Sequence, residues 1–242
     1  MFYQTFFNMT YGCVKYTKKK RDDVKIISII TYVFIAIFFR YIFTVTKPVI
    51  IIKFVEDGLL YDILTGIGPF LSVIIVSIIF KRKLLYSNFG TSKFKTVISI
   101  LVPLLLFFLY DYFGVSVNYT NFLIVIACII YSFFEEYGWR GYLQSELIGL
   151  SFFVRISLIT IIWFIWHLNF SLSLSNMFFL LVLFFASWGI GKIAIKTQSI
   201  IVCACFHAVY NIALNIELNI HTLSILLICI VSWFIIWYKL QI

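Results

Sequence analysis

Charged residues are scarce in this sequence. Only 12% of its 242 residues are Asp, Glu, Lys or Arg, whereas 63% are hydrophobic, and the mean hydropathy is +1.06. Soluble domains carry about 25% charged residues, so the scarcity excludes an ordinary soluble globular domain. Little sequence remains outside the apolar runs, and no internal repeat is visible. The chain is therefore interpreted as a single polytopic membrane domain.

Several catalytic and structural motifs are missing as well. The sequence has no His-Glu-x-x-His zinc signature, no Gly-x-Ser-x-Gly nucleophile element and no evident pair of intramembrane aspartates. Its five cysteines are an odd number and lie mostly in apolar runs, so no disulfide framework is expected. The first 20 residues lack an apolar core followed by a small-residue cleavage site, so no signal peptide is recognised.

Apolar runs dominate what is present. A helix needs about 20 residues to span a bilayer, and the runs predict an all-α bundle of about eight transmembrane helices over residues 26–239. Residues 1–25 are interpreted as a cytoplasmic or interfacial segment. The helix breakers Gly66-Ile-Gly68-Pro69 and Pro103 are expected to kink or loosen the second and third spans. The expected spans cover approximately residues 26–46, 61–80, 96–113, 121–143, 156–174, 176–191, 198–217 and 222–239.

The net charge of +9 is unevenly distributed. With the N-terminus in the cytoplasm, only Lys47 and Lys53 fall in an outer loop, and this asymmetry predicts that both termini are cytoplasmic. The excess of Lys and Arg residues is then explained by the orientation in the membrane and by contact with anionic lipid. Nucleic acid is not expected as a partner. The residues predicted inside are Lys15, Lys18, Lys19, Lys20, Arg21, Lys25, Lys81, Arg82, Lys83, Lys93, Lys95, Arg155, Lys192, Lys196 and Lys239.

Three ionisable residues lie in the apolar run that begins at Phe122. They are Glu135, Glu136 and Arg140, and ionisable groups inside a membrane span mark a functional site by default. Glu136 and Arg140 are four residues apart with the acid first, the favoured order for a helical ion pair. Glu135 points about 100° away from Glu136 around the helix axis. It is therefore expected to stay outside that pair and to be available for chemistry; a purely structural ion-paired cluster is the alternative.

Two of the three histidines, His167 and His207, also lie inside expected spans. His207 and Asn211 are four residues apart and share a helical face, which Asn215 extends by another turn. At a rise of 1.5 Å per residue, Glu135, His167 and His207 lie about 12–16 Å from the cytoplasmic ends of their helices. We therefore expect a carboxylate, two imidazoles and an amide to meet at one level of the membrane.

Such a set of groups is typical of amide hydrolysis by an activated water. A glutamate in a membrane cavity can act as general base and acid, and a neutral histidine can orient and polarise the same water. Histidine and asparagine N–H groups on one helical face can receive a developing oxyanion. This chemistry needs no cofactor. A zinc site built from Glu135, His167 and His207 is a geometric alternative.

The polar motifs resemble those of the CPBP family. These are intramembrane glutamic endopeptidases related to CAAX prenyl proteases and to bacterial Abi and bacteriocin-immunity proteins. The resemblance covers about residues 121–217, and the first three spans show no family signature. The matching motifs are Glu135-Glu136-x-x-x-Arg140, Trp163-x-x-x-His167 and His207-x-x-x-Asn211.

The resemblance implies a role for each motif. Glu135 would activate the hydrolytic water together with His167, and His207 and Asn211 would form the oxyanion hole. The ion pair of the first motif would support the site. The second motif usually opens with phenylalanine, and here Trp163 stands in that place. Because both residues are aromatic, we expect an altered substrate shape and not a loss of activity.

The substrate is less closely defined. Eukaryotic relatives cleave after a prenylated cysteine, but the small size and the Ile, Phe and Lys usage indicate the plasma membrane of a Gram-positive bacterium. The resemblance then implies bacteriocin self-immunity, or processing of a peptide or membrane protein. Two alternatives are not proteolytic: a membrane protein that binds or scaffolds a peptide, and a small transporter with Glu135 as its proton site. The sequence predicts no oligomeric state.

Overall fold

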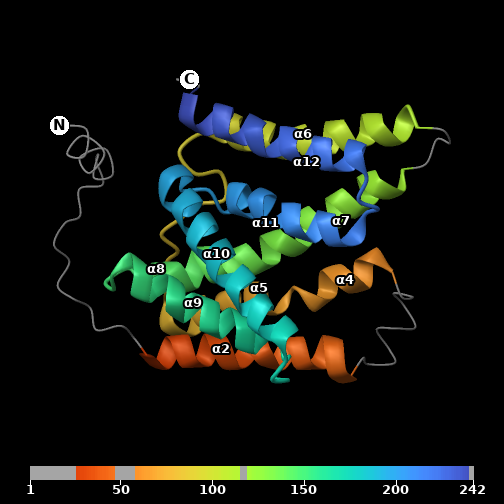
Figure 1. The fold of residues 1–242 in the computed structure, drawn as a ribbon. Coiled ribbons are helices and arrows are strands. Elements are labelled where there is room, and N and C mark those ends of the chain that lie inside the picture. The colour runs from red at the N-terminus through yellow and green to blue at the C-terminus, as the bar shows by residue number, and fades with distance from the viewer. Residues whose placement is uncertain (1–25, 47–57, 115–118, 240–242) are drawn as a thin grey trace.

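A computed structural model describes residues 26–46, 58–114 and 119–239, and these residues form an all-α bundle (Figure 1). Within these ranges the only β-type pairing is an isolated bridge between Ser87 and Ser199. The α-helices and the π-helices, labelled η, are α2 (Ile26–Tyr41), η1 (Ile42–Thr46), α4 (Leu59–Thr65), α5 (Gly68–Phe80), α6 (Lys93–Tyr112), α7 (Thr120–Glu136), η2 (Tyr137–Leu143), α8 (Gln144–Glu146), α9 (Phe152–Trp166), α10 (Leu174–Thr197), α11 (Ile200–Asn215), α12 (Ile220–Phe234) and η3 (Ile235–Lys239).

Each of the expected spans coincides with a helical segment. In the described ranges five helices are each long and apolar enough to cross a membrane, and α9 and α11 are shorter apolar helices. The remaining span is the broken pair of α4 and α5, which is bent by 43° at Gly66-Ile67, as the breakers predict. Pro103 lies inside α6, which continues past it. The prediction of an all-α membrane protein is confirmed.

The expected boundary between the fifth and sixth spans is wrong. α9 ends at Trp166, and Leu168 has a left-handed φ of 57°. The side chain of Ser173 accepts a hydrogen bond from the backbone N–H of Asn176 and so caps α10. The side chains of Asn176 and Asn169 also bond to each other, at 2.7 and 3.1 Å. These polar contacts stabilise a turn that the apolar periodicity alone does not predict.

The bundle places α7 at its centre. α2 lies along one side, α6 and α12 lie together on the opposite side, and α7 and α11 run between them (Figure 1). α7 packs most extensively against α11 and also contacts α4, α5 and α6. Residues near the C-terminal end of α7 are therefore enclosed by other helices, which removes the carboxylates of this segment from the surface.

Two polar turns meet at one end of the bundle. The backbone N–H of Ser87 donates to the carbonyl of Gln198, and the N–H of Ile200 donates to the carbonyl of Ser87, at 3.2 and 3.0 Å. The basic segments 81–83 and 192–196 flank these turns and were both predicted on the cytoplasmic side. Both basic segments lie at the same end of the bundle, which agrees with that prediction. That this end faces the cytoplasm stays a prediction. Residues 1–25, Lys47, Lys53 and the last three residues lie outside the described ranges.

The cysteines of the described ranges behave as packing residues. Cys128, Cys203, Cys205 and Cys229 are all buried and unpaired, while Cys13 lies outside the described ranges. Small apolar side chains of this kind fill the closely packed space between α7, α11 and α12.

A π-helical segment continues α7 directly after Glu136. This segment, η2, buries Trp139 and Arg140 completely. A side chain at Gly138 would collide with the Tyr32 hydroxyl and with Pro69, so only glycine allows η2 to approach α2 and α5 this closely. π-helical turns within α-helices are frequent at functional sites. Here the turn directs the carboxylates of α7 and the side chains of η2 into one buried volume.

Candidate active site

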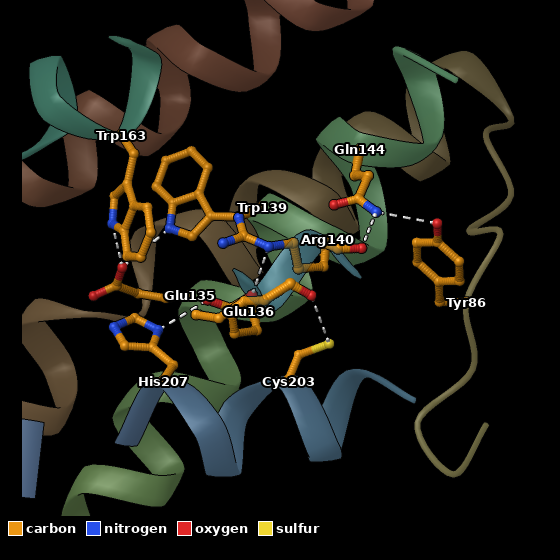
Figure 2. A network of polar contacts seen from close by, with 11 residues as sticks. Tyr86, Glu135, Glu136, Trp139, Arg140, Gln144, Trp163, Cys203 and His207 are labelled. Atoms are coloured by element: carbon orange, nitrogen blue, oxygen red, sulfur yellow. Dashed lines mark hydrogen bonds and ion pairs between the residues drawn. The ribbon is translucent and has the colours of Figure 1, made fainter. Parts of the chain in front are cut away.

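Glu135 lies in the last turn of α7 and is only 1% exposed. Its Oε2 atom accepts hydrogen bonds from two indoles, from Nε1 of Trp139 at 3.0 Å and from Nε1 of Trp163 at 2.7 Å. Trp139 belongs to η2, and Trp163 comes from α9 (Figure 2). No ion pair joins Glu135 to a basic residue of the described ranges. The carboxylate that was expected to be available for chemistry is thus held by neutral donors.

The second oxygen of Glu135, Oε1, is directed away from both indoles (Figure 2). Tyr131 lies one turn earlier on α7 than Glu135. Tyr131 also lines a cavity, described below. Tyr131 therefore lies both one helical turn from Glu135 and in the wall of this cavity.

Glu136 is fully buried and has two partners. Its Oε2 atom lies 3.3 Å from Nε of Arg140, the ion pair that the spacing predicts, and its Oε1 atom lies 2.9 Å from Nδ1 of His207. The contact with His207 was not expected. Nη1 and Nη2 of the buried Arg140 side chain have no hydrogen-bond partner among the described residues. Its guanidinium lies over the Trp163 ring, 5.4 Å from the centroid. Glu136 is therefore the main counter-charge of this cation.

The contact with Glu136 determines which nitrogen of His207 carries a proton. A carboxylate paired with Arg140 is ionised and can only accept hydrogen bonds, so Nδ1 of His207 must be the donor. In the neutral ring Nε2 is then an acceptor, and it can donate only from the doubly protonated imidazolium. An oxyanion-binding role for Nε2 consequently requires His207 to be protonated on both nitrogens.

Two matching pairs connect α7 and α11. Glu136 contacts His207, and one turn away the side-chain amide of Asn211 donates to Oγ of Ser132 at 3.0 Å. Residues 132 and 136 share one face of α7, and residues 207 and 211 share one face of α11, so antiparallel packing places both pairs in register. The third motif thus faces the first, as its expected role requires.

His167 lies at the C-terminal end of α9 and packs among aromatic rings. Its ring centroid is 5.0 Å from that of Trp166, 4.8 Å from that of Phe179 and 6.4 Å from that of Trp163. Among the described residues no hydrogen bond joins His167 to Glu135. The structure brings His167 close to the site through Trp163, and a direct contact with the expected base is not formed.

The zinc alternative needs Glu135, His167 and His207 to converge on one point. Within the described ranges no group of three or more His, Cys, Asp or Glu side chains is placed to hold a metal ion. Glu135, His167 and His207 are grouped around Trp163, and Oε2 of Glu135 is directed at indole donors. The donor geometry therefore gives no support to the zinc alternative.

A cavity of about 230 Å³ opens between α4, α7 and α11. Half of its ten lining residues are apolar and half carry polar side chains, and Asn211 lies in its wall. This space is suited to a polar chain such as a peptide backbone, because its lining offers both hydrogen-bond donors and acceptors. The polar lining residues are Asp62, Thr65, Tyr131, Asn211 and Asn215.

Several residues of this site were not identified from the sequence. Trp139 and Tyr131 lie four residues after and before Glu135, a spacing that could have indicated contact on one helical face. Arg40 of α2 was not among the residues that the sequence placed at the site. Its Nη1 donates to the carbonyl of Thr65 at 3.0 Å, and its guanidinium lies 4.4 Å from the centroid of the Trp166 ring. No local signal in the sequence connects Arg40 with these partners.

Comparison with known families agrees with this geometry. Residues 117–213 match the model of one family, described as type II CAAX prenyl endopeptidase Rce1-like. This central part of the chain is similar to that family. The matched region contains all three motifs, so the resemblance expected from the sequence is confirmed and supports a CAAX-type protease in a membrane. No curated protein matches the chain, and no solved structure matches it either.

Proposed function

We propose that this protein is an intramembrane glutamic endopeptidase in which Glu135 activates a water for attack on a peptide bond. The observation that carries the proposal is a buried carboxylate with one oxygen held by two indoles and the other directed away from them. A base of this kind is oriented before the substrate arrives. The Rce1-like match of the same segment supports the reaction class.

The reaction follows from these positions. Oε1 of Glu135 takes a proton from water while the water oxygen forms a bond to the peptide carbonyl carbon. The electron pair of the carbonyl bond moves to its oxygen and gives a tetrahedral oxyanion. When this intermediate collapses, the carbon–nitrogen bond breaks, and the proton held by Glu135 passes to the leaving amine. No covalent enzyme intermediate is formed.

The hydrogen-bond donors for the oxyanion come from α11. The amide of Asn211 and Nε2 of a doubly protonated His207 are the proposed donors, and preorganised donors of this kind stabilise charge as it develops. Glu136 holds His207 in place through Nδ1. His167, which has no direct bond to Glu135 here, is proposed to orient the water once substrate is bound, since catalytic hydrogen bonds often tighten only then.

We propose an unprenylated peptide or membrane protein as the substrate. The mixed polar lining and the size of the cavity between α4, α7 and α11 support a peptide chain more than a long isoprenoid group, which needs a continuous apolar channel. Bacteriocin self-immunity or peptide processing in a bacterial plasma membrane is the biological role that we propose for this activity.

Substitution of Glu135 distinguishes between two hypotheses, a protease and a peptide-binding protein without catalytic activity. Glu135→Gln keeps the size of the side chain but removes the base, so we expect cleavage of a membrane-peptide library by the purified protein in detergent to be abolished. Asn211→Ala should lower the rate by about 100- to 1,000-fold, because one oxyanion donor is lost. Binding of the peptides should persist in both variants.

Glu146→Gln is the matched control, because Glu146 pairs with Arg82 away from the site, and it should cleave at the rate of the wild type. A strong chelator should have no effect on the wild type. Full activity of Glu135→Gln would contradict the proposal. Binding without cleavage by every form, the wild type included, would favour a peptide-binding protein. Loss of activity with the chelator alone would require a metal.

A further inference from the structure

Trp163 is the residue at which this chain departs from the pattern of the second motif. Phenylalanine has no N–H group, whereas Nε1 of Trp163 donates to Oε2 of Glu135 at 2.7 Å, and Nε1 of Trp139 donates to the same atom. We propose that Trp139 and Trp163 form an indole clamp that holds Oε2 of Glu135 and leaves Oε1 as the oxygen that accepts the proton. The inference rests on the proposed function of Glu135 as a base.

The hydrogen-bond inventory of the carboxylate supports this assignment. Each carboxylate oxygen has about two acceptor sites, and both sites of Oε2 are filled by the two indoles. An indole N–H can only donate, so neither tryptophan can take part in proton transfer. A water that bound to Oε2 would leave a buried N–H without a partner, which is unfavourable. The reacting water is therefore directed to Oε1, which faces away from the clamp (Figure 2).

The clamp is rigid because each indole is packed among other rings. The centroids of Trp139 and Trp163 are 6.0 Å apart, and Trp139 also contacts Trp166 at 5.8 Å and Tyr32 at 6.0 Å. Trp139 and Trp163 are no more than 2% exposed. Trp163 packs edge-on against His207 as well, with centroids 5.0 Å apart. Trp163 thus contacts both the carboxylate of Glu135 and the imidazole of His207, and it fixes their relative positions.

Trp166 provides a matched control within the same helix. It lies one turn after Trp163 on α9 and is completely buried, but its Nε1 donates to the backbone carbonyl of Ala36 at 3.2 Å. Replacing Trp166 by phenylalanine removes the same N–H group and the same volume of ring. It leaves both hydrogen bonds of Glu135 in place.

A spectroscopic experiment tests the clamp without any need for activity. The full-length protein is labelled with ¹⁵N at the indole nitrogens, and the indole N–H resonances are recorded by NMR in detergent for the wild type and Glu135→Gln. Hydrogen bonds to an ionised acceptor are stronger than those to a neutral one. We expect the resonances of Trp139 and Trp163 to move upon substitution and that of Trp166 to stay. If the first two resonances move no more than the third, the clamp is disproved.

The pH dependence of cleavage tests the role of the clamp in the reaction. Donors to the ionised carboxylate favour the form that acts as a base. In Trp163→Phe and in Trp139→Phe, the acidic limb of the pH–rate profile should therefore move to higher pH. In Trp166→Phe the limb should stay where it is in the wild type, even if the rate falls.

The outcomes of the two experiments are distinguishable. An equal fall in rate for all three tryptophan variants, with an unmoved acidic limb, would show that the indoles only fill space and would overturn the positioning role. Absence of cleavage by the wild type would contradict the proposed function, whereas the NMR experiment would still decide whether the clamp exists.

Discussion

At the scale of single residues, the site depends on charges that are neutralised inside the bundle. Arg140 has one ionised partner, Glu136, and none of its three guanidinium nitrogens makes a hydrogen bond in the described part of the chain. Removing one member of a buried ion pair leaves an uncompensated charge, which costs far more than the pair contributes. The Glu136–Arg140 pair is therefore expected to matter for folding and, through His207, for the reaction.

Arg140→Ala should lower the free energy of unfolding by about 3–5 kcal/mol, because Glu136 is then left charged and unpaired in a buried site. Thermal unfolding in detergent measures this effect. The control is Arg82→Ala, which breaks the less completely buried Arg82–Glu146 pair and should cost less than Arg140→Ala does. Equal stability of Arg140→Ala and Arg82→Ala would contradict the structural importance of the buried pair.

At the scale of helices, the ends of α7 are fixed in two different ways. Its C-terminal end continues into η2, which brings Trp139 and Arg140 to the carboxylates. Its N-terminal end is held by Asp111 of α6, whose carboxylate accepts from the backbone N–H of Phe122 at 2.8 Å and from the side chain of Asn121 at 2.7 Å. Asp111 is 4% exposed. This carboxylate supplies the capping function at a helix start whose N-cap residue makes no side-chain cap bond.

Asp111→Ala should destabilise the protein by about 2–3 kcal/mol, because two hydrogen bonds to a charged group are lost and a helix N-terminus is left uncapped. Hydrogen exchange should also become faster in the first turn of α7 than in α11. Thr31→Ala, which removes an exposed side-chain bond within α2, should change the stability by less than about 0.5 kcal/mol. An unchanged exchange rate at Phe122 in Asp111→Ala would exclude the capping role.

At the scale of the whole molecule, the polar turns define two ends of the bundle. The turn around Ser87 and the turn at Ser199 are joined by backbone hydrogen bonds and carry basic neighbours. The connection between α9 and α10, with its exposed Leu172, belongs to the opposite side in the predicted topology. The orientation of the protein is therefore known once an experiment shows on which side of the membrane one of these two ends lies.

Cysteine labelling tests this topology. In a cysteine-free background, a single cysteine at Lys83 should react with an impermeant reagent only when the cytoplasmic side is accessible, because the basic segments are retained inside. A single cysteine at Leu172, which is fully exposed, should react from the outside of intact cells. Labelling of both positions from the same side would refute the predicted arrangement.

Local signals alone predicted the all-α fold class and some of the side chains that meet around Glu135 and Glu136. Apolar runs predicted where the long helical segments lie, because each helix has to satisfy its own backbone hydrogen bonds in a membrane. Spacing by four residues predicted the Glu136–Arg140 pair and the shared face of His207 and Asn211, because neighbours on one helix are fixed by its geometry. The sequence predicted that the fifth span continues to about residue 174, whereas α9 ends at Trp166. The turn that follows depends on side-chain hydrogen bonds between Asn169 and Asn176, which apolar periodicity does not reveal.

Only the tertiary structure decided which groups from different helices meet. The indole of Trp163 on Glu135, the imidazole of His207 on Glu136 and the guanidinium of Arg40 over Trp166 each join residues that are far apart in the chain. Periodicity shows which face of a helix is polar, but it contains no information on which other helix covers that face. That choice is made by the packing of whole side chains between helices, and it has assigned the carboxylate of Glu135 to two neutral donors and that of Glu136 to two basic side chains.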